Sequence, residues 1–308
     1  MNPFTQKSLW VLVIGGALLA NTGCKKDEDD AIVPDPTPAS NLITIDQPIS
    51  ASTEWTADHR YLIKGFVEVE AGATLTIAPG TVIFGDKTTK GTLIINRGAT
   101  INAAGTAADP IVFTSAEPAG SRAPGDWGGI ILCGRAPVNL PGGTGVVEGG
   151  VEAVFGGTDA ADNSGRLSFV RIEFPGIAFQ PNNEINGLTL AGVGSGTTID
   201  HIQVSYSGDD SYEWFGGAVN SKRIISFGGL DDDFDMDNGF SGKLQFGVAV
   251  RDANQADASG SNGLEHDNDA SGSTNSPFTT PIITNVSILG PLATSTSTPN
   301  DNYKRSAH

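Results

Sequence analysis

Apolar and polar residues alternate in four short runs of the chain, and each run repeats the pattern of the one before. Strict alternation has the period of a β-strand and argues against helices, because successive side chains of a strand point to opposite faces. The runs begin at Val170, Ile202, Arg223 and Leu244, so the last two spacings are equal. Such repetition is typical of a solenoid, in which each coil of short parallel strands buries one face on the coil below. The alternating positions are Val170, Ile172, Phe174; Ile202, Val204, Tyr206; Arg223, Ile225, Phe227; and Leu244, Phe246, Val248.

Arg223 is the exception to this pattern, since a charged residue falls on the apolar face. Either it lies at the end of a coil, or the alignment is shifted by one position at that point.

An earlier segment has its own repeat. The stretch from Gly72 to Ile77 returns as Gly98 to Ala103. Leucine and isoleucine at alternate positions are expected to point inward, and the glycines to turn the corners between strands. These segments predict the first coils of the same stack, so the expected fold class is an all-β solenoid. Between the two repeating regions, 141–165 is glycine-rich and polar and is predicted to be a loop that leaves the stack.

The composition fits a slender stack and excludes one class of partner. The chain of 308 residues has 40 glycines and only 7% aromatic residues, which suits many turns and a narrow core. Its net charge of −17 argues against nucleic acid, because binding to phosphates needs a basic surface.

Residues 1–24 are predicted to be a targeting segment. An apolar run from Leu9 to Ala20 is too short to span a bilayer, and small residues lead into Cys24. This ending resembles a bacterial lipobox, with Cys24 as the lipidated residue; the alternative is a plain secretory signal. Residues 25–41 are expected to be an acidic, proline-rich linker. The acidic cluster behind Cys24 resembles a surface-export signal of Bacteroidota lipoproteins, which implies display on the outer face of the outer membrane.

The chain resembles a family of Bacteroidota outer-membrane surface lipoproteins. Four phrases carry the resemblance, and they span roughly Ala71 to Pro291. That family is similar to right-handed parallel β-helix proteins, so the resemblance implies this fold for residues 42–308. The resemblance implies a cellular location and a fold, but it does not imply any enzymatic reaction. The phrases are Gly72-Ala73-Thr74-Leu75, Asp109 to Ser115, Gly125 to Leu132, and Asn186 to Leu190 continuing to Ser207-Gly208-Asp209-Asp210.

Acidic residues are concentrated in the repeating region. Between His201 and Ala270 the chain has thirteen acidic and four basic residues, a net charge of 4 − 13 = −9. If Tyr212, Phe234 and Leu264 point inward, the residues that follow them point outward and stack about 4.8 Å apart. Carboxylates at that spacing repel one another unless a cation lies between them or their pKa values rise. The candidate metal ligands are Asp209, Asp210, Glu213, Asp231, Asp232, Asp233, Asp235, Asp237, Glu265 and Asp267.

Calcium is the cation that this pattern favours, because hard cations bind several carboxylate and carbonyl oxygens. The alternative is a solvated acidic face that keeps neighbouring stacks apart. An EF-hand is excluded: Asp233, Asp235 and Asp237 have its first spacing, but Asn238 occupies the glycine position and Leu244 that of the bidentate glutamate. Any site must therefore be assembled across coils.

Enzymatic and binding functions both remain open for such a scaffold, and binding is favoured. A polysaccharide lyase would need a basic residue beside the acidic coils, for which Lys222, Arg223 and Arg251 are candidates. A glycosidase would need two carboxylates roughly 5 to 9.5 Å apart, which stacked coils supply by default. Trp127 is a candidate for stacking on a sugar, although it could equally close a coil.

Two further side chains are expected to be structural. Cys133 follows an apolar run and is interpreted as a buried thiol, and His266 has the register of a core residue. At the end of the chain, the stretch after Leu292 shows no capping pattern, so the sequence suggests that coils are missing there. The combined expectation is a lipid-anchored β-helix on the cell surface that binds or adheres to polysaccharide or matrix material.

Overall fold

The computed structural model describes residues 41–180, 183–291 and 300–308. These belong to the second of two units of the chain, Pro36–His308. The predicted signal segment, the predicted lipidation site Cys24 and the predicted linker up to residue 40 lie outside the described residues.

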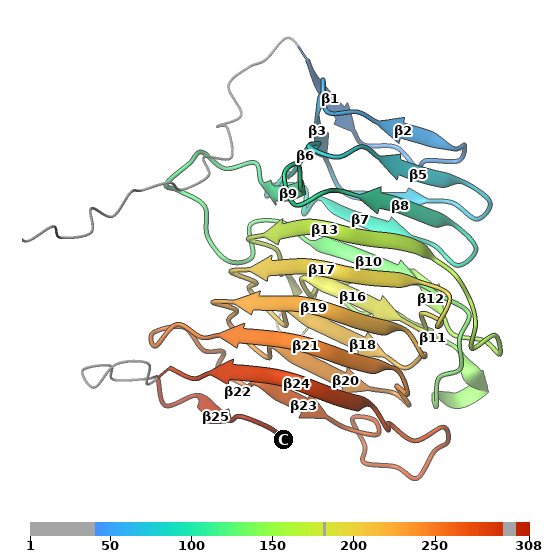
Figure 1. The fold of residues 1–308 in the computed structure, drawn as a ribbon, viewed down its shortest axis with the longest axis vertical. Helices are drawn as coiled ribbons and strands as arrows, with labels where there is room; N and C mark the ends of the chain where they lie inside the picture. Colours follow the sequence, from blue (N-terminus) through green and yellow to red (C-terminus); the bar gives the residue numbers. More distant parts are fainter. Residues whose placement is uncertain (1–40, 181–182, 292–299) are drawn as a thin grey trace, which may run out of the picture. The chain divides into compact units, whose positions relative to one another are not determined.

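The described chain is a right-handed parallel β-helix, as the resemblance implied (Figure 1). Two parallel sheets, here called sheet A and sheet B, contain most of its strands. Sheet A has twelve strands: β1 (Leu42–Ile45), β2 (Thr53–Trp55), β3 (Arg60–Ile63), β5 (Thr74–Ile77), β6 (Val82–Gly85), β8 (Thr100–Ala104), β9 (Ile111–Ser115), β13 (Gly165–Glu173), β17 (Thr198–Ser205), β19 (Asn220–Phe227), β21 (Lys243–Val250) and β24 (Ile282–Leu289).

Sheet B has seven strands and lies behind sheet A in Figure 1. They are β4 (Phe66–Val69), β7 (Thr92–Ile95), β10 (Gly129–Cys133), β16 (Leu188–Ala191), β18 (Tyr212–Phe215), β20 (Phe234–Asp237) and β23 (Leu264–His266). The remaining elements are three two-stranded pairs and one 3-10 helix. They are β11 (Gly145–Val146) with β12 (Val154–Phe155), β14 (Ala178–Gln180) with β15 (Asn183–Glu184), β22 (Ser261–Asn262) with β25 (Tyr303–Arg305), and η1 (Pro141–Gly143).

The core consists of files of apolar side chains at matching positions of successive coils. On sheet B, Leu188, Tyr212, Phe234 and Leu264 are register partners, and the first three are fully buried. The hydroxyl of Tyr212 donates to the carbonyl oxygens of Ile202 and Ile225 across the core, at 3.0 and 2.9 Å. Side chains of sheet B therefore tie it to the backbone of sheet A.

The sequence repeat in the first coils is confirmed. Leu75 pairs with Ile101 and Ile77 with Ala103, which is the pairing that the repeat predicts. All four side chains are buried.

The register predicted for the later coils was correct for the first two runs and wrong after them. Val170 pairs with Ile202 as expected, but Ile202 pairs with Ile224 and Ile224 with Gly247. The predicted partners were Arg223 and Leu244, so the true spacing between coils is longer and is not constant. Ile225, Phe227, Phe246 and Val248 consequently face solvent, each at least 36% exposed.

A single residue with positive φ near the middle of each long strand of sheet A interrupts the alternation, so Leu244 and Ala249 point inward on its two sides while Val248 is exposed. The part of β13 before the corner pairs with β8 and the part after it pairs with β9, so each long strand joins two consecutive short strands of a coil. Arg223 occupies this position in β19, which explains a charged residue inside an apolar run. The five corner residues are Phe169, His201, Arg223, Phe246 and Asn285, with φ between 51° and 62°.

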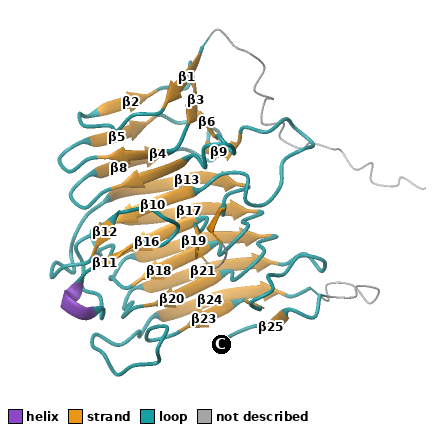
Figure 2. Ribbon diagram, turned by 180° about the vertical axis from the view of Figure 1, so that it is seen from behind, coloured by secondary structure: helices purple, strands orange, loops and turns teal. Residues whose placement is uncertain are grey.

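A long loop covers part of the outer face of sheet B. Residues 134–164 leave the stack, as predicted for most of this stretch, and carry η1 and the β11–β12 hairpin (Figure 2). Val147 and Phe155 of this loop pack with Ile94 and Ile131, which point outward from β7 and β10. The loop thereby buries the apolar part of that face and ends where the acidic coils begin.

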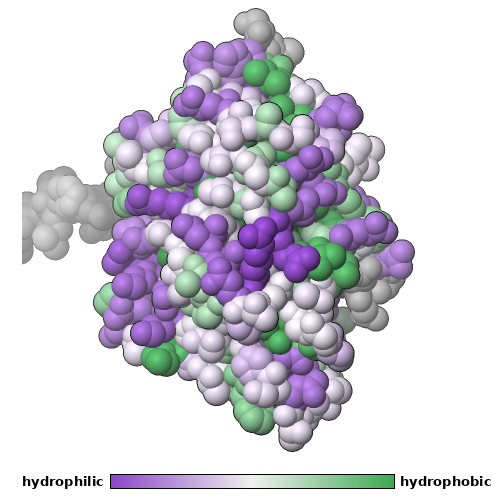
Figure 3. Space-filling model, turned by 90° about the vertical axis from the view of Figure 1, so that its right-hand side faces the viewer, coloured by the Kyte–Doolittle hydropathy of each residue, from purple (hydrophilic) through white to green (hydrophobic). Residues whose placement is uncertain are grey.

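No described residue lies in a helix long and apolar enough to cross a membrane. On the side shown in Figure 3, hydrophilic and weakly polar residues cover most of the surface, and hydrophobic residues form small separate patches.

Candidate cation-binding groove

One outward file of sheet B changes from apolar to acidic along the stack. Ile94, Ile131 and Thr189 are followed in register by Glu213, Asp235 and Glu265. The predicted pairing of Glu213 with Asp235, and of Asp235 with Glu265, is therefore confirmed. It arises because Tyr212, Trp214, Phe234 and Met236 are all buried on the inner face, which leaves the alternate residues outside.

The turns before β18 and β20 bring further carboxylates to this file. Asp209, Asp210 and Asp231 form one group in which carboxylate oxygens lie within 4.8 Å of one another. Asp210, Glu213 and Asp235 form a second group at the same spacing. Asp210 belongs to both groups. These five residues are called the acidic cluster below.

Nearby polar groups satisfy only part of the cluster. Asp210 accepts a hydrogen bond from the backbone N–H of Asp232 at 2.8 Å. The side-chain amide of Asn186 donates to Glu213 and, at 3.3 Å, to Glu148. Among the described residues, Oδ1 of Asp235 is buried without any hydrogen-bond partner. None of the five carboxylates pairs with a Lys or Arg of the described chain.

Burial and mutual repulsion raise the pKa values of these carboxyls. Loss of hydration is the largest cause at Asp209, Asp210, Glu213 and Asp235, and neighbouring carboxylates add to it, so all four pKa values lie well above the ordinary range. For Asp231 the same causes raise the pKa to about 6. Two ionised carboxylates about 4.8 Å apart repel by roughly 3 kcal/mol at an effective dielectric constant of ~20. Protons or a cation must relieve that repulsion.

Other predicted ligands lie at the margin of the cluster. Asp232 accepts a backbone hydrogen bond from Asn262, and burial together with the nearby carboxylates raises its pKa to about 9. Asn262 also donates to Glu265 at 2.8 Å, and hydrogen bonds at Glu265, that with Asp232 foremost, lower the pKa of Glu265. Burial raises the pKa of Asp237 to about 8.

Two of the predicted ligands lie neither in the cluster nor at its margin. Asp233 points away from it and forms a buried ion pair with Arg251, at 3.1 Å, and accepts a hydrogen bond from Ser226 at 2.6 Å. Asp267 is exposed beyond the end of β23. Asp233 is therefore part of a structural ion pair and Asp267 is a surface residue, so neither is placed to serve as the metal ligand that the sequence predicted.

The acidic file opens into two hollows on the outer side of sheet B. The first has a volume of about 550 Å³ and lies between the long loop, with Glu148 and Phe155, and the coils carrying Glu213 and Asp237. The second, of about 300 Å³, is lined by Asp210, Asp231, Asp232, Asp235 and Glu265, with Lys304 and Arg305 at its edge. The two hollows border neighbouring carboxylates of the file, since Glu213 lines the first and its register partner Asp235 lines the second, and they are together called the acidic groove below.

Comparison with known proteins assigns the fold family. Residues 47–301 match the pectate-lyase-like beta helix domain, which is most of the chain. The chain belongs to this family. The match connects the pectate-lyase-like β-helix to carbohydrate-related function. No curated protein and no solved structure matched the chain.

Trp127 of this pectate-lyase-like β-helix is a core residue, which corrects its prediction as a ligand-binding side chain. It is fully buried, and its indole N–H donates to the carbonyl oxygen of Glu173 at 2.8 Å. Its ring fills the space above Gly85, where a Cβ atom would lie 2.5 Å from the ring atoms. No face of the indole is left for a sugar.

The basic residues considered for a lyase reaction do not reach the groove. Lys222 and Arg223 lie on the outer face of sheet A, and the guanidinium of Arg251 is buried against Asp233 and backbone carbonyls. Cys133 is buried as predicted, and burial raises the pKa of its thiol to about 12. His266 pairs with Met236 in the inward register and is half-buried.

Sequence reasoning missed Asn186, Glu148 and Asn262 as polar neighbours of the cluster. Asn186 could have been found, because it lies two residues before β16, the strand that stacks on β18. Glu148 could not, since it comes from a loop whose path over sheet B has no periodic signal.

Proposed function

We propose that this pectate-lyase-like β-helix is a lipid-anchored protein of the bacterial cell surface that binds polysaccharide through divalent cations held in the acidic groove. Calcium is the cation that fits best. In this proposal the ion is shared between carboxylates of the protein and oxygens of the glycan, and the protein acts as a binding or adhesion module.

The observation that carries the proposal is the group of Asp210, Glu213 and Asp235. One carboxylate oxygen from each of the three residues lies within 4.8 Å of the other two, and Oδ1 of Asp235 is buried without a hydrogen-bond partner among the described residues. A cation bound there would neutralise these carboxylates. Calcium binds roughly six to eight oxygen atoms and tolerates irregular geometry, so ligands from a strand and a turn suit it. A cation with part of its coordination open to the groove can also bind an acidic sugar.

The cell-surface location in this proposal is inferred from the sequence alone. The lipobox-like ending at Cys24 and the acidic residues behind it support acylation and export to the outer face of the outer membrane.

A polysaccharide lyase on the same scaffold is the alternative. Lys304 and Arg305 border the smaller hollow beside Asp210 and Asp235, so a basic group is available there. Incubation with uronate polymers separates the two functions: a lyase generates an unsaturated, ultraviolet-absorbing product, and a binding module retains the polymer intact.

Calorimetric titration of the chelator-treated protein with CaCl₂ tests the cation site. We expect binding heat and a rise in melting temperature for the natural protein, and loss of both in Glu213→Gln and Asp235→Asn. Asp46→Asn is the matched control, because it removes one exposed carboxylate far from the cluster in sequence and should bind Ca²⁺ normally. Absence of heat with the natural protein, or undiminished heat in both cluster variants, contradicts the proposal.

A further inference from the structure

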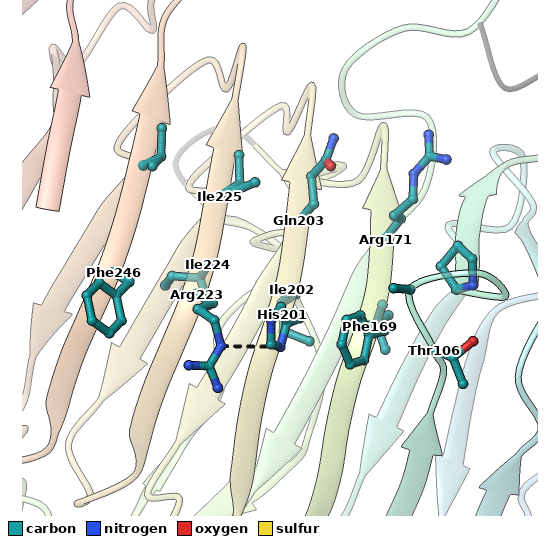
Figure 4. Close-up of a pocket in the computed structure, with 14 residues that line it drawn as sticks. Thr106, Phe169, Arg171, His201, Ile202, Gln203, Arg223, Ile224, Ile225 and Phe246 are labelled. Carbon is teal, nitrogen blue, oxygen red and sulfur yellow. Dashed lines mark hydrogen bonds between the residues drawn. The ribbon is translucent and has the colours of Figure 1, made fainter. Parts of the chain in front are cut away.

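A second groove lies on the outer face of sheet A, at the corner where its long strands bend. Its volume is about 470 Å³. One wall is the row of corner residues Phe169, His201, Arg223 and Phe246, and the other is the row Arg171, Gln203, Ile225 and Val248 from the same strands (Figure 4). The backbone between the rows forms the floor, so the groove crosses successive coils along the axis of the stack.

The corner row combines flat rings with hydrogen-bonding groups. The rings of Phe169 and His201 stack with centroids 4.2 Å apart. Next to them Arg223 donates to Nδ1 of His201 at 3.4 Å and to both carboxylate oxygens of Asp200, at 2.9 and 2.7 Å. Phe246 follows and is 45% exposed. The row thus offers apolar surface and polar edges within one groove.

The face that carries this groove is basic, unlike the rest of the chain. The strands β13, β17, β19, β21 and β24 contain five Lys or Arg residues and two acidic residues, a net charge of 5 − 2 = +3. The whole chain has −17, so all other residues together carry −20. Lys222 and Lys243 are exposed, and neither is in an ion pair within the described part of the chain.

The corner residues have a left-handed backbone conformation that is uncommon for large side chains. Left-handed positions favour Gly or Asn, and bulky residues there are strained. Four successive coils place Phe, His, Arg and Phe at this position, although Asn285 occupies it in the next coil. Strain of this kind is found preferentially at functional sites.

We propose that the corner groove is a second glycan site, which binds an anionic sugar chain directly and without a metal ion. The basic groups that surround the groove attract carboxylate or sulfate groups, and the exposed ring of Phe246 with Ile225 and Val248 packs against the apolar faces of the sugars. Two coils span about 10 Å, the length of a disaccharide, so a linear glycan that lies along the stack can contact side chains from successive coils. This inference does not depend on the cation groove.

Binding of the full-length chain to alginate and to heparin in EDTA tests it, with neutral dextran as the comparison. EDTA removes the contribution of the acidic groove, so failure of one site is distinguishable from failure of the other. We expect the carboxylated or the sulfated polymer to bind, binding to weaken with salt, and dextran not to bind. Arg223→Gln should weaken binding about tenfold, because it removes a charged hydrogen-bond donor.

Matched variants distinguish binding in the groove from non-specific effects of charge and of exposed apolar side chains. Phe246→Ala should weaken binding severalfold at an unchanged melting temperature. Phe278→Ala, similarly exposed but between β23 and β24, and Lys64→Gln, between β3 and β4, should bind as the natural protein does. Failure to bind either anionic polymer in EDTA overturns the proposal. So does equal loss in Lys64→Gln and Arg223→Gln, or retention by anionic phospholipid vesicles in place of the glycans.

Discussion

The outward file of sheet B and the corner row of sheet A both arise because successive coils stack in register. The file of sheet B gathers negative charge, whereas the strands that carry the corner row have a net positive charge. On sheet B, Glu213 and Asp235 stack with no cation of the described chain between them. On sheet A, Asp200 of one coil is neutralised by Arg223 of the next. In a solenoid, residues at matching positions of successive coils lie one coil spacing apart. A charged residue is therefore neutralised within the protein when the next coil places an opposite charge beside it, and otherwise it needs a proton or a bound ion.

The largest expected effect concerns Asp233, the buried carboxylate that is paired with Arg251. Arg251→Ala leaves Asp233 fully buried without its partner, which should destabilise the protein by roughly 3–5 kcal/mol. Urea unfolding in chelator at pH 8 measures this. The double variant Arg251→Met with Asp233→Leu is the control and should recover most of the loss; a single variant as stable as the natural protein would show that the pair is dispensable.

A smaller effect is expected from pH, through the carboxylates that lack a cation. Asp237 and Asp232 have pKa values of about 8 and about 9 in the folded chain, above the ordinary value of 3.8. Between roughly pH 4 and pH 8 the folded state therefore holds protons that the unfolded chain has lost. Stability in chelator should fall as pH rises through this window, by about 1.4 kcal/mol per pH unit for each such proton.

Calcium should oppose this fall, since it replaces the lost protons. Melting temperatures in EDTA and in Ca²⁺ should be nearly equal at pH 4.5 and differ most at pH 8. The fall in EDTA should also be shallower in Asp237→Asn. Stability that rises steadily from pH 5 to pH 8 in EDTA would contradict the raised pKa values.

The smallest effect is expected at the corner row. Arg223 is 43% exposed in its side chain, so its ion pair with Asp200 is screened by water. Arg223→Ala should therefore change the free energy of unfolding by less than about 1 kcal/mol. Urea unfolding of Arg223→Ala and Arg251→Ala under the same conditions checks this. A comparable loss of unfolding free energy in both variants would remove the contrast between the two faces.

The register of sheet B could be predicted from the sequence, and that of sheet A only in part. Tyr212-Glu213-Trp214 and Phe234-Asp235-Met236 alternate without interruption, so their inner and outer faces are unambiguous. In sheet A each of the five long strands bends at one left-handed residue, which interrupts the alternation of inward and outward side chains. Glycine or asparagine would have marked the bend, but most coils use Phe, His or Arg there.

The candidate site was predictable in its strand residues and not in its surroundings. Stacking of Glu213 on Asp235 follows from period-two alternation alone. The turn residue Asp233 could not be separated from Asp231, because the direction of a side chain in a turn depends on long-range partners, here Ser226 and Arg251. The burial of Trp127 depended on Gly85, in a coil far away in sequence.

Asp210 is shared by both groups of carboxylates, and this makes their occupancies interdependent. An ion bound by either group draws on the same side chain and lowers the repulsion felt by the other. Successive ions would then bind with unequal affinities, so a titration should depart from the curve of two independent, identical sites.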